Sequence, residues 1–274
     1  INRNFFTLFQ EGRELLRKDV GAVMDAQREK ALEEFKAHGI PYGHENYRYA
    51  NLLPVLERDY NVSLRYVEQE VDLSEVFQCN VPCLDTHLLL TINGRFWRGN
   101  ERPDVPEGVI VCGLAEASVK YKELVDKHYN QFTEPGRADG LVDLNTMLAQ
   151  DGVFVYVPDG VVMERPLQIV NLARAKADLM SFQRNLVIVG KGAKATLLVC
   201  DHTLSDHYFL MNNLTEIVAG ENALMDYYHV QNQHLGASQI NSVFVSQRRN
   251  SRFEANVISL YGGFIRNNLY AALT

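Results

Sequence analysis

The sequence predicts a mainly β protein, a right-handed parallel β-helix preceded by an α+β N-terminal domain. Two observations support this fold class. A segment of about 28 residues, read as two strands and two turns, occurs three times after residue 184 and begins a fourth time before the last residue. The first 150 residues instead mix helical and strand patterns. A fixed period of this size is typical of a stacked supersecondary unit, and stacked strand units form a parallel β-helix.

Four asparagines mark the phase of the repeat, at intervals of 28, 28 and 27 residues: Asn185, Asn213, Asn241 and Asn268. At a step of 28, the odd-numbered positions from Asn185 to Val199 are mostly apolar in each copy, and the even-numbered positions are mixed and charged. Alternate side chains of a strand point to opposite faces. We therefore expect the odd positions inside the β-helix, with the first three asparagines in a stacked ladder. The even positions would face solvent, another protein or the N-terminal domain. An antiparallel sandwich is the alternative, which the lack of Asn-Gly turns between copies disfavours.

The region before the repeats predicts several separate elements. An amphipathic helix is expected over 19–38, ended by Gly39 and Pro41. The remaining elements are a short helix in 45–60, a hairpin over 87–98 with a type I′ turn at Asn93-Gly94, a strand over 108–113, a helix around 115–129, a polar loop through Pro135 and Gly136, and a helix over 141–149. Strands over 154–157 and 161–170 would form an irregular first coil. We place the domain boundary near residue 150, giving domains 1–150 and 151–274, with the hairpin docked on the first coil.

Composition excludes several classes of partner. Lysine and arginine number 27 and aspartate and glutamate 34, a net charge of −7, which argues against nucleic acid and anionic membranes. No apolar run is long enough for a transmembrane helix, and the N-terminus is a poor signal peptide. The four cysteines are too few for a disulfide framework, so a reducing cytoplasm is the expected location. The chain begins without methionine and ends inside a repeat copy, so we expect a C-terminally truncated fragment.

Cysteines are the first candidates for metal chemistry. Cys79 and Cys83 form a C-x₃-C rather than the C-x₂-C of common metal sites, which favours two structural thiols around a proline turn. Cys112 lies in an apolar strand and is expected in a core. Cys200 has the soft thiolate that cluster ligation needs, but its parity places it on the outward face.

Asp201 and His229 are the strongest polar candidates. Asp201 has inward parity, and at a step of 28 residues it stacks on His229. A buried carboxylate needs a partner, so we expect the two side chains within roughly 10 Å of each other. Two roles stay open for this interior pair: a satisfied hydrogen-bonded corner, or a polar relay or ligand site that would bind a cofactor.

Other polar groups predict neither a metal site nor catalytic residues. The histidines and aspartate near turns do not stack at the repeat, so they predict no metal cluster: His202, Asp206, His207 and His234. Gly190-Lys191-Gly192 lacks the phosphate-loop spacing, and no nucleophile elbow is present. Any ATP chemistry would therefore come from a partner.

Four segments in this order resemble the SufB/SufD family of iron–sulfur cluster assembly proteins, and within it SufD. FKAHGIPYGHENYRYANL (Phe35 to Leu52) is similar to the family's N-terminal GxPxxxxExWxYT segment, although Tyr47 and Tyr49-Ala50 replace the usual Trp and Tyr-Thr. PDGVVMERPLQIV (Pro158 to Val170) resembles the entry into the β-helix. RNLVIVGKGAKATLL follows, and GGFIRNNLYAAL (Gly262 to Leu273) resembles the family's GGxxxRNxLxxxL stretch.

The resemblance implies a non-enzymatic subunit of a SufB–SufC–SufD-type assembly scaffold. Its partners would be a SufB-like β-helix and, through a region after Thr274, a SufC-like ATPase, with a homodimer as a further open arrangement. The iron–sulfur cluster would be held transiently in the full complex, and no cofactor would be bound by this fragment. In SufB-like sequences a cysteine corresponds to Asp201, which favours the SufD type here. Direct contact with cluster or flavin, and the stoichiometry, stay open.

A carbohydrate-active β-helix enzyme is the alternative function. Such enzymes need clustered acidic and basic residues on one outward sheet, and Asp226 and Glu254 with Arg252 are the candidates. A hexapeptide acyltransferase is disfavoured because the repeat is not a multiple of short hexads. Copurified partners would separate the scaffold from the enzyme.

Overall fold

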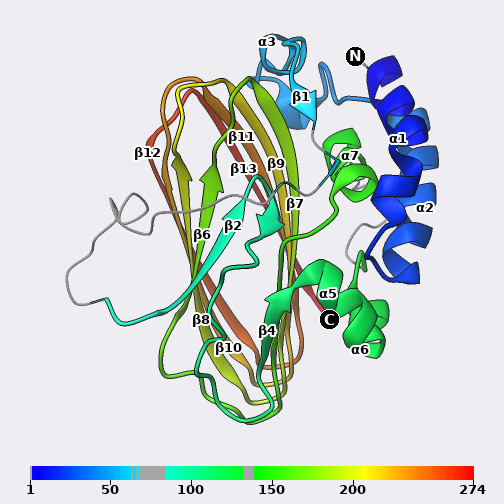
Figure 1. The fold of residues 1–274 in the computed structure, drawn as a ribbon. Helices are drawn as coiled ribbons and strands as arrows, with labels where there is room; N and C mark the ends of the chain where they lie inside the picture. Colours follow the sequence, from blue (N-terminus) through cyan, green and yellow to red (C-terminus); the bar gives the residue numbers. More distant parts are fainter. Residues whose placement is uncertain (1, 63, 66, 68–83, 132–138) are drawn as a thin grey trace.

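Two β-sheets lie face to face along most of the chain, and helices cover one of them (Figure 1). The computed structural model describes residues 2–62, 64–65, 67, 84–131 and 139–274. Repeat strands alternate between the sheets, so each coil contributes one strand to each sheet and stacks in parallel on the coil before it. The parallel β-helix expected from the repeat is confirmed, as a solenoid of about four turns.

The solenoid strands are long and regular. The first sheet has the order β13 (Phe264–Leu273), β11 (Ala237–Gln247), β9 (Phe209–Ala219), β7 (Leu179–Val189), β5 (Val153–Val157) and β4 (Ile110–Gly113), with β1 (Asn61–Val62) beside β7. The second sheet has the order β12 (Arg252–Tyr261), β10 (Leu224–Asn232), β8 (Lys194–Thr203), β6 (Leu167–Ala173), β2 (His87–Ile92) and β3 (Arg95–Phe96).

The constant step of 28 residues is wrong in detail. In the first sheet Gln183 pairs with Asn213, Asn213 with Asn241 and Asn241 with Asn267, which are steps of 30, 28 and 26 residues. From β7 onward, the turn from the first to the second sheet spans four residues each time (190–193, 220–223 and 248–251), whereas the return turn shortens from 204–208 to 233–236 to 262–263. Because every step is even, the inward parity survives the change of register.

The predicted ladder of Asn185, Asn213 and Asn241 is therefore only partly correct, because Gln183 and not Asn185 pairs with Asn213. Asn185 pairs with Thr215 rather than with Asn213, and Asn268 pairs with Ser242 on the other parity. Only the Asn213–Asn241 step of the expected ladder is present, where the Nδ2 group of Asn213 donates to Oδ1 of Asn241 over 3.2 Å.

Odd-numbered side chains fill the interior, as the parity predicts. The larger interior cluster lies toward the ends of the first-sheet strands, and Val187, Val189, Leu197 and Val199 belong to it. A smaller apolar cluster lies at the opposite end, around Leu179 and Phe209. Burial of these side chains is the main favourable term for the solenoid.

The helices precede the solenoid in sequence and pack on the outer face of its first sheet (Figure 1). Their bounds are α1 (Asn2–Arg17), α2 (Ala22–His38), the 3₁₀ turn η1 (Glu45–Tyr47), α3 (Leu53–Leu56), α5 (Leu114–Lys120), α6 (Lys122–His128) and α7 (Gly140–Leu148). The sequence predicts α2 and α7 closely. It predicts one helix where α5 and α6 meet at Tyr121, and it does not predict α1. The polar loop through Pro135 and Gly136 lies outside the described residues.

This helical cover explains why part of the outward face is buried. Ile188, Glu216 and Phe244 have outward parity, but all three are buried beneath the N-terminal region. The charged Glu216 is paired there with the equally buried Arg184, whose Nε atom donates to Oε1 of Glu216 over 2.8 Å. The helices thus pack on the outward face of the first sheet. Contact with the N-terminal domain was one of the three alternatives expected for the even-numbered positions.

The hairpin docks on the first coil, as expected. β2 pairs in parallel with β6, and Asn93 and Gly94 both have positive φ, 50° and 81°, which a type I′ turn requires. A Cβ atom on Gly94 would lie 2.5 Å from the backbone oxygen of Phe182. Since β4 likewise pairs with β5, residues before position 150 extend both sheets.

Candidate functional site

Polar side chains occupy the interior of the solenoid between its two apolar clusters. In the second sheet, five neighbouring strands each have a polar residue at the same inward position. In the first sheet, four neighbouring strands each have an amide residue at the position that faces it. The members are Thr91, Asn171, Asp201, Gln231 and Ser259, and Gln183, Asn213, Asn241 and Asn267. The two stacks are joined across the interior, for example by Gln183 Nε2, which donates to Asn171 Oδ1 over 2.9 Å.

Asp201 and His229 form the centre of this network. The Nε2 atom of His229 lies 2.5 Å from Oδ2 of Asp201, so the predicted proximity is confirmed. The expected stacking is not, because Asp201 pairs directly with Gln231, and His229 pairs with Val199. The imidazole reaches the carboxylate diagonally, which the spacing of neighbouring strands permits.

The Asp201 carboxylate is fully buried and well satisfied. Asn171 Nδ2 donates to Oδ1, and Gln239 Nε2 donates to Oδ2, each over 2.7 Å. Burial acts to raise the pKa of Asp201, but the charge of His229 and the hydrogen bonds from three side chains outweigh it, so the pKa lies below its ordinary value. The carboxylate is therefore held in its ionised form.

Tyr227 extends the pair on the other side of the imidazole. Its hydroxyl lies 3.3 Å from Nδ1 of His229. Burial and the nearby Asp201 raise the pKa of Tyr227, which keeps its hydroxyl protonated. The cavity beside these residues measures only about 10 Å³, which is about the minimum for one water molecule. In this conformation the pair can hold and orient a proton, but it has no room for a substrate or a cluster. Its use as a relay or ligand site stays a prediction.

The cysteine candidates lie apart from this network. Cys200 has outward parity as expected, yet it is buried in an apolar cluster with Leu90, Val170 and Leu172. Its Sγ atom accepts from Gln168 Nε2 at 3.7 Å. Cys112 lies on β4, where burial, then Glu116 and Asp151, raises its pKa to about 12. Cys79 and Cys83 lie outside the described residues.

The turn histidines do not converge. The ring Nδ1 atom of His234 accepts from the backbone of Gly236, and His207 lies 4.0 Å from Asp178. His202 is buried near the end of β8, and Asp206 is exposed on the turn after that strand. Within the described ranges, no group of three or more histidine, cysteine, aspartate or glutamate residues is arranged to hold a metal ion.

The acidic residues of the alternative enzyme function are adjacent but open to solvent. Asp226 pairs with Glu254 on neighbouring strands, and Arg252 forms an ion pair with Glu254. None of these three residues lines the small cavity beside His229 or the cleft between the hairpin and the first coil.

Sequence reasoning missed the amides that complete the site. Gln231 and Gln239 are fully buried and bond to each other over 3.3 Å. Their inward parity was readable, because Gln231 lies two residues after His229 on the same strand. A buried amide at an inward position predicts a partner on a neighbouring coil, and this signal could have extended the pair into a network.

These features define a class: a two-sheet parallel solenoid with a helical cover on one sheet and the two joined stacks of polar side chains inside, which we call the polar seam. The two halves of the chain match two domains of the same protein family. Residues 1–169 match the SufBD protein N-terminal region, and residues 171–274 match the SufBD core domain of SUF system FeS cluster assembly. The chain belongs to the SufBD family of iron–sulfur cluster assembly proteins, and its relatives are consistent with a SufD-type subunit.

Curated relatives match about half of this chain. An iron–sulfur cluster assembly SufBD family protein of Synechocystis sp. is 32% identical over 132 residues, 47% of this chain and 27% of the relative. SufD of Bacillus subtilis is 25% identical over 150 residues, 54% of this chain and 34% of the relative. A chloroplastic family protein of Arabidopsis thaliana is 28% identical over 134 residues, 48% of this chain and 24% of the relative. The aligned part thus spans between a quarter and a third of these relatives.

A helix can cross a bilayer only if it is about 20 residues long and mostly apolar. None of the helices that the structure describes meets both conditions.

Proposed function

We propose that this chain is a non-enzymatic subunit of a SufB–SufC–SufD-type scaffold for iron–sulfur cluster assembly. The observation that carries the proposal is the match of both halves of the chain to one assembly family. The proposed partners are a SufB-like β-helix and a SufC-like ATPase, and the cluster is the cargo of the assembled complex rather than a resident group of this chain.

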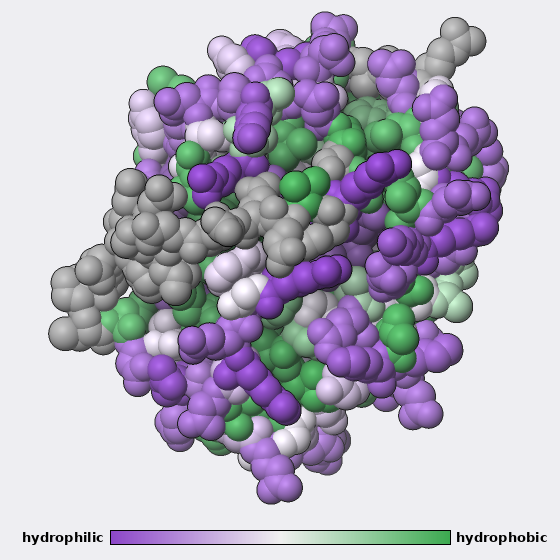
Figure 2. Space-filling view, viewed as in Figure 1, coloured by the Kyte–Doolittle hydropathy of each residue, from purple (hydrophilic) through white to green (hydrophobic). Residues whose placement is uncertain are grey.

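The architecture supports a role in binding proteins. A parallel solenoid gives a rigid surface, and the helices leave the outer face of the second sheet uncovered at Leu224 and Tyr228, which are 43% and 38% exposed. Figure 2 shows hydrophobic side chains between hydrophilic ones on the viewed face of the molecule. Exposed apolar groups among charges are typical of a protein-binding surface.

The chemistry of the interior supports a non-enzymatic role. The Asp201 carboxylate of the polar seam is buried and is already hydrogen-bonded to Asn171, Gln239 and His229. Neither Cys112 nor Cys200 is in a disulfide bond, which supports a reducing compartment such as the cytoplasm.

Copurification tests this proposal. The full-length protein, tagged and expressed in its own host, should recover a β-helix paralogue and an ATPase in a defined ratio, measured by mass spectrometry and light scattering. The complex, loaded anaerobically with iron and sulfide, should show cluster absorbance, whereas this subunit alone should hydrolyse neither ATP nor a polysaccharide panel. Recovery of neither partner together with polysaccharide cleavage would overturn the proposal in favour of the carbohydrate enzyme.

A further inference from the structure

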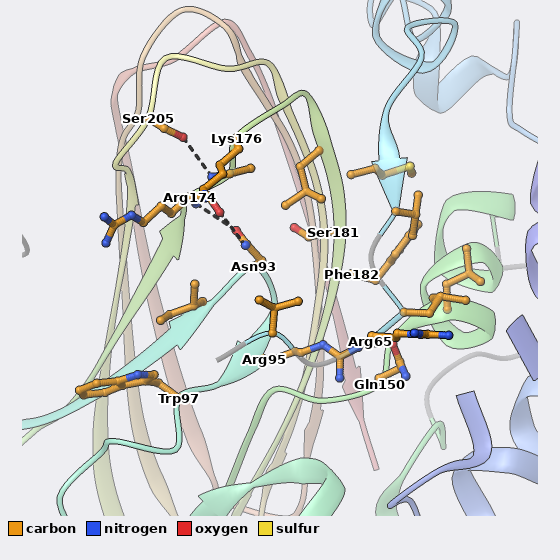
Figure 3. A pocket seen from close by; sticks show the side chains of 18 of the residues that line it. Arg65, Asn93, Arg95, Trp97, Gln150, Arg174, Lys176, Ser181, Phe182 and Ser205 are labelled. Atoms are coloured by element: carbon orange, nitrogen blue, oxygen red, sulfur yellow. Dashed lines mark hydrogen bonds between the residues drawn. The ribbon is translucent and has the colours of Figure 1, made fainter. Parts of the chain in front are cut away.

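A large cleft lies at the end of the solenoid where the hairpin meets the first coil (Figure 3). Its volume is about 840 Å³, within the range of small-molecule sites. The hairpin β2–β3, residues near β1, the turn between β6 and β7, and the first residues of β7 line it. It is separate from the polar seam and has no part in the proposed scaffold function.

The cleft is positively charged. Four cationic side chains from different segments line it: Arg65, Arg95, Arg174 and Lys176. Among the described lining residues there is no aspartate or glutamate. The chain as a whole carries a net charge of −7, so this concentration of positive charge runs against the balance of the molecule and would attract an anion locally.

Hydrogen bonds fix the segments that carry these charges. Asn93 donates through Nδ2 to the backbone oxygen of Arg174 over 2.7 Å and accepts from its backbone nitrogen over 3.0 Å. Ser205 accepts from the backbone nitrogen of Ala175 over 3.1 Å. A ligand would therefore meet a preorganised turn, which lowers the entropic cost of binding.

Arg95 is held at the other side of the cleft. Its guanidinium donates to Oε1 of Gln150, and Gln150 donates through Nε2 to the backbone of Leu15 over 3.0 Å. Arg65, Arg95 and Arg174 all make further contacts within the chain. A guanidinium has five N–H donors, so a ligand would share these side chains rather than occupy unpaired ones.

Most of the remaining lining residues are apolar. Ile92, Leu148, Met180 and Phe182 are buried residues at the wall of the cleft, and the Trp97 ring lies at its edge (Figure 3). An apolar wall beside several cations matches a molecule that carries its charge at one end and an apolar body at the other.

We propose that this cleft binds a small phosphate ester with an aromatic or aliphatic body. Arginine matches the geometry of both phosphate and carboxylate. Four cationic side chains around one cleft can share the two charges of a phosphate, which favours a dianionic phosphate over a single carboxylate.

Calorimetric titration of the full-length protein tests the proposal with phenyl phosphate as the probe. Inorganic phosphate, benzoate and phenol are the comparison compounds, since each lacks one feature of the probe. Phenyl phosphate should bind at least tenfold more tightly than each of them, and its affinity should fall as salt is raised. Equal binding of phenyl phosphate and phenol, or no binding of phenyl phosphate, would overturn the proposal.

Two variants and a control locate the binding. Arg95→Gln and Lys176→Gln should each weaken phenyl phosphate binding at least fivefold, with an unchanged unfolding midpoint for the exposed Lys176. Arg249→Gln is the matched control, because Arg249 is an exposed cation on the turn at the opposite end of the strands. If Arg249→Gln weakens binding as much as Lys176→Gln does, the phosphate is not held in the cleft and the proposal fails.

Discussion

The Nε2 atom of His229 lies 2.5 Å from Oδ2 of Asp201 in the sealed interior of the solenoid, although the strand register places Gln231 directly beside Asp201. The imidazole therefore crosses to the neighbouring inward position to reach the carboxylate. Asp201 also accepts hydrogen bonds from the amides of Asn171 and Gln239, and the other ring nitrogen of His229 lies beside the Tyr227 hydroxyl. The pair thus links β8 to β10 through side chains as well as through the backbone.

Asp201→Asn should destabilise the protein by about 2–4 kcal/mol, because it leaves His229 buried beside a neutral amide. Urea unfolding followed by circular dichroism measures the loss. Asp206→Asn is the control, since Asp206 is exposed on the turn after β8, and it should change the free energy of unfolding by less than about 0.5 kcal/mol.

The same variant should reveal the sign of the Asp201 titration. The folded-state pKa of Asp201 is lowered, so its contribution is present above the unfolded pKa of about 3.9 and is lost as pH falls through the lower folded value. The stability difference between the natural protein and Asp201→Asn should accordingly narrow below about pH 4. A difference that widens on acidification would contradict the ionised carboxylate.

Asp143→Asn should stabilise the protein at pH 8. Burial, then Asp139 and Glu34, raises the pKa of Asp143 to about 7, and the ring Nδ1 atom of His38 lies 3.8 Å from Oδ2 of Asp143. A carboxyl whose folded pKa is raised makes stability fall as pH rises from about 4 to 7. The variant should remove this decline and gain about 1–3 kcal/mol at pH 8. Unfolding curves from pH 4 to 8 test this, and the exposed Asp59→Asn should leave the profile unchanged.

Glu216→Leu should cost about 3–5 kcal/mol, because it leaves the Arg184 guanidinium buried without its anion between the first sheet and the helices. The double variant Arg184→Met/Glu216→Leu should lose clearly less than the sum of the two single variants. A double-mutant cycle in urea measures this coupling.

The exposed pair of Glu116 and Lys120 on α5 is the comparison for this cycle. Its coupling should be much smaller than that of the buried pair, because solvent screens it. Additive losses at Arg184 and Glu216 would show that the buried charges do not act as a pair.

Gly94→Ala should destabilise the protein more than Gly43→Ala. Both glycines have positive φ, 81° and 74°, so both substitutions carry the cost of a left-handed alanine, about 1 kcal/mol. Only at Gly94 would the new methyl group meet the backbone oxygen of Phe182, at 2.5 Å, whereas Gly43 faces open space. Thermal unfolding should separate the two variants by about 1–3 kcal/mol, and equal midpoints would contradict the close approach of hairpin and β7.

Periodicity predicted the parts of this structure that depend on alternation along a strand. The inward parity of Val187 and Leu197, the outward parity of Cys200 and the proximity of Asp201 to His229 follow from a period of two, which survives any even change of register. The residues that pair on neighbouring strands could not be predicted exactly. Pairing depends on the length of each turn, and the nearly constant spacing of the asparagines does not show that these lengths differ.

The repeat pattern could not predict features that depend on how distant parts of the chain pack together. The burial of Glu216 beside Arg184 requires a helical layer whose position no local signal gives. Helix α1 is different, because Phe5, Phe9 and Leu16 recur at helical spacing and are buried on one face, so a local pattern was available to predict it. The cleft combines the hairpin with the turn of the first coil, and only the docked arrangement brings Arg95 and Arg174 to one place.

The two ends of each coil differ in how they tolerate added length. At one end, four-residue turns repeat without change and bond from coil to coil, with Gly190 donating to Val157 and Gly220 to Val189, each over 2.8 Å. At the other end the connections have already changed length twice without disturbing the sheets. A protein engineer who wished to insert an epitope or a fluorophore site should therefore graft it at residues 206–208, beyond the cleft residues Leu204 and Ser205, and leave residues 190–193 and 220–223 intact.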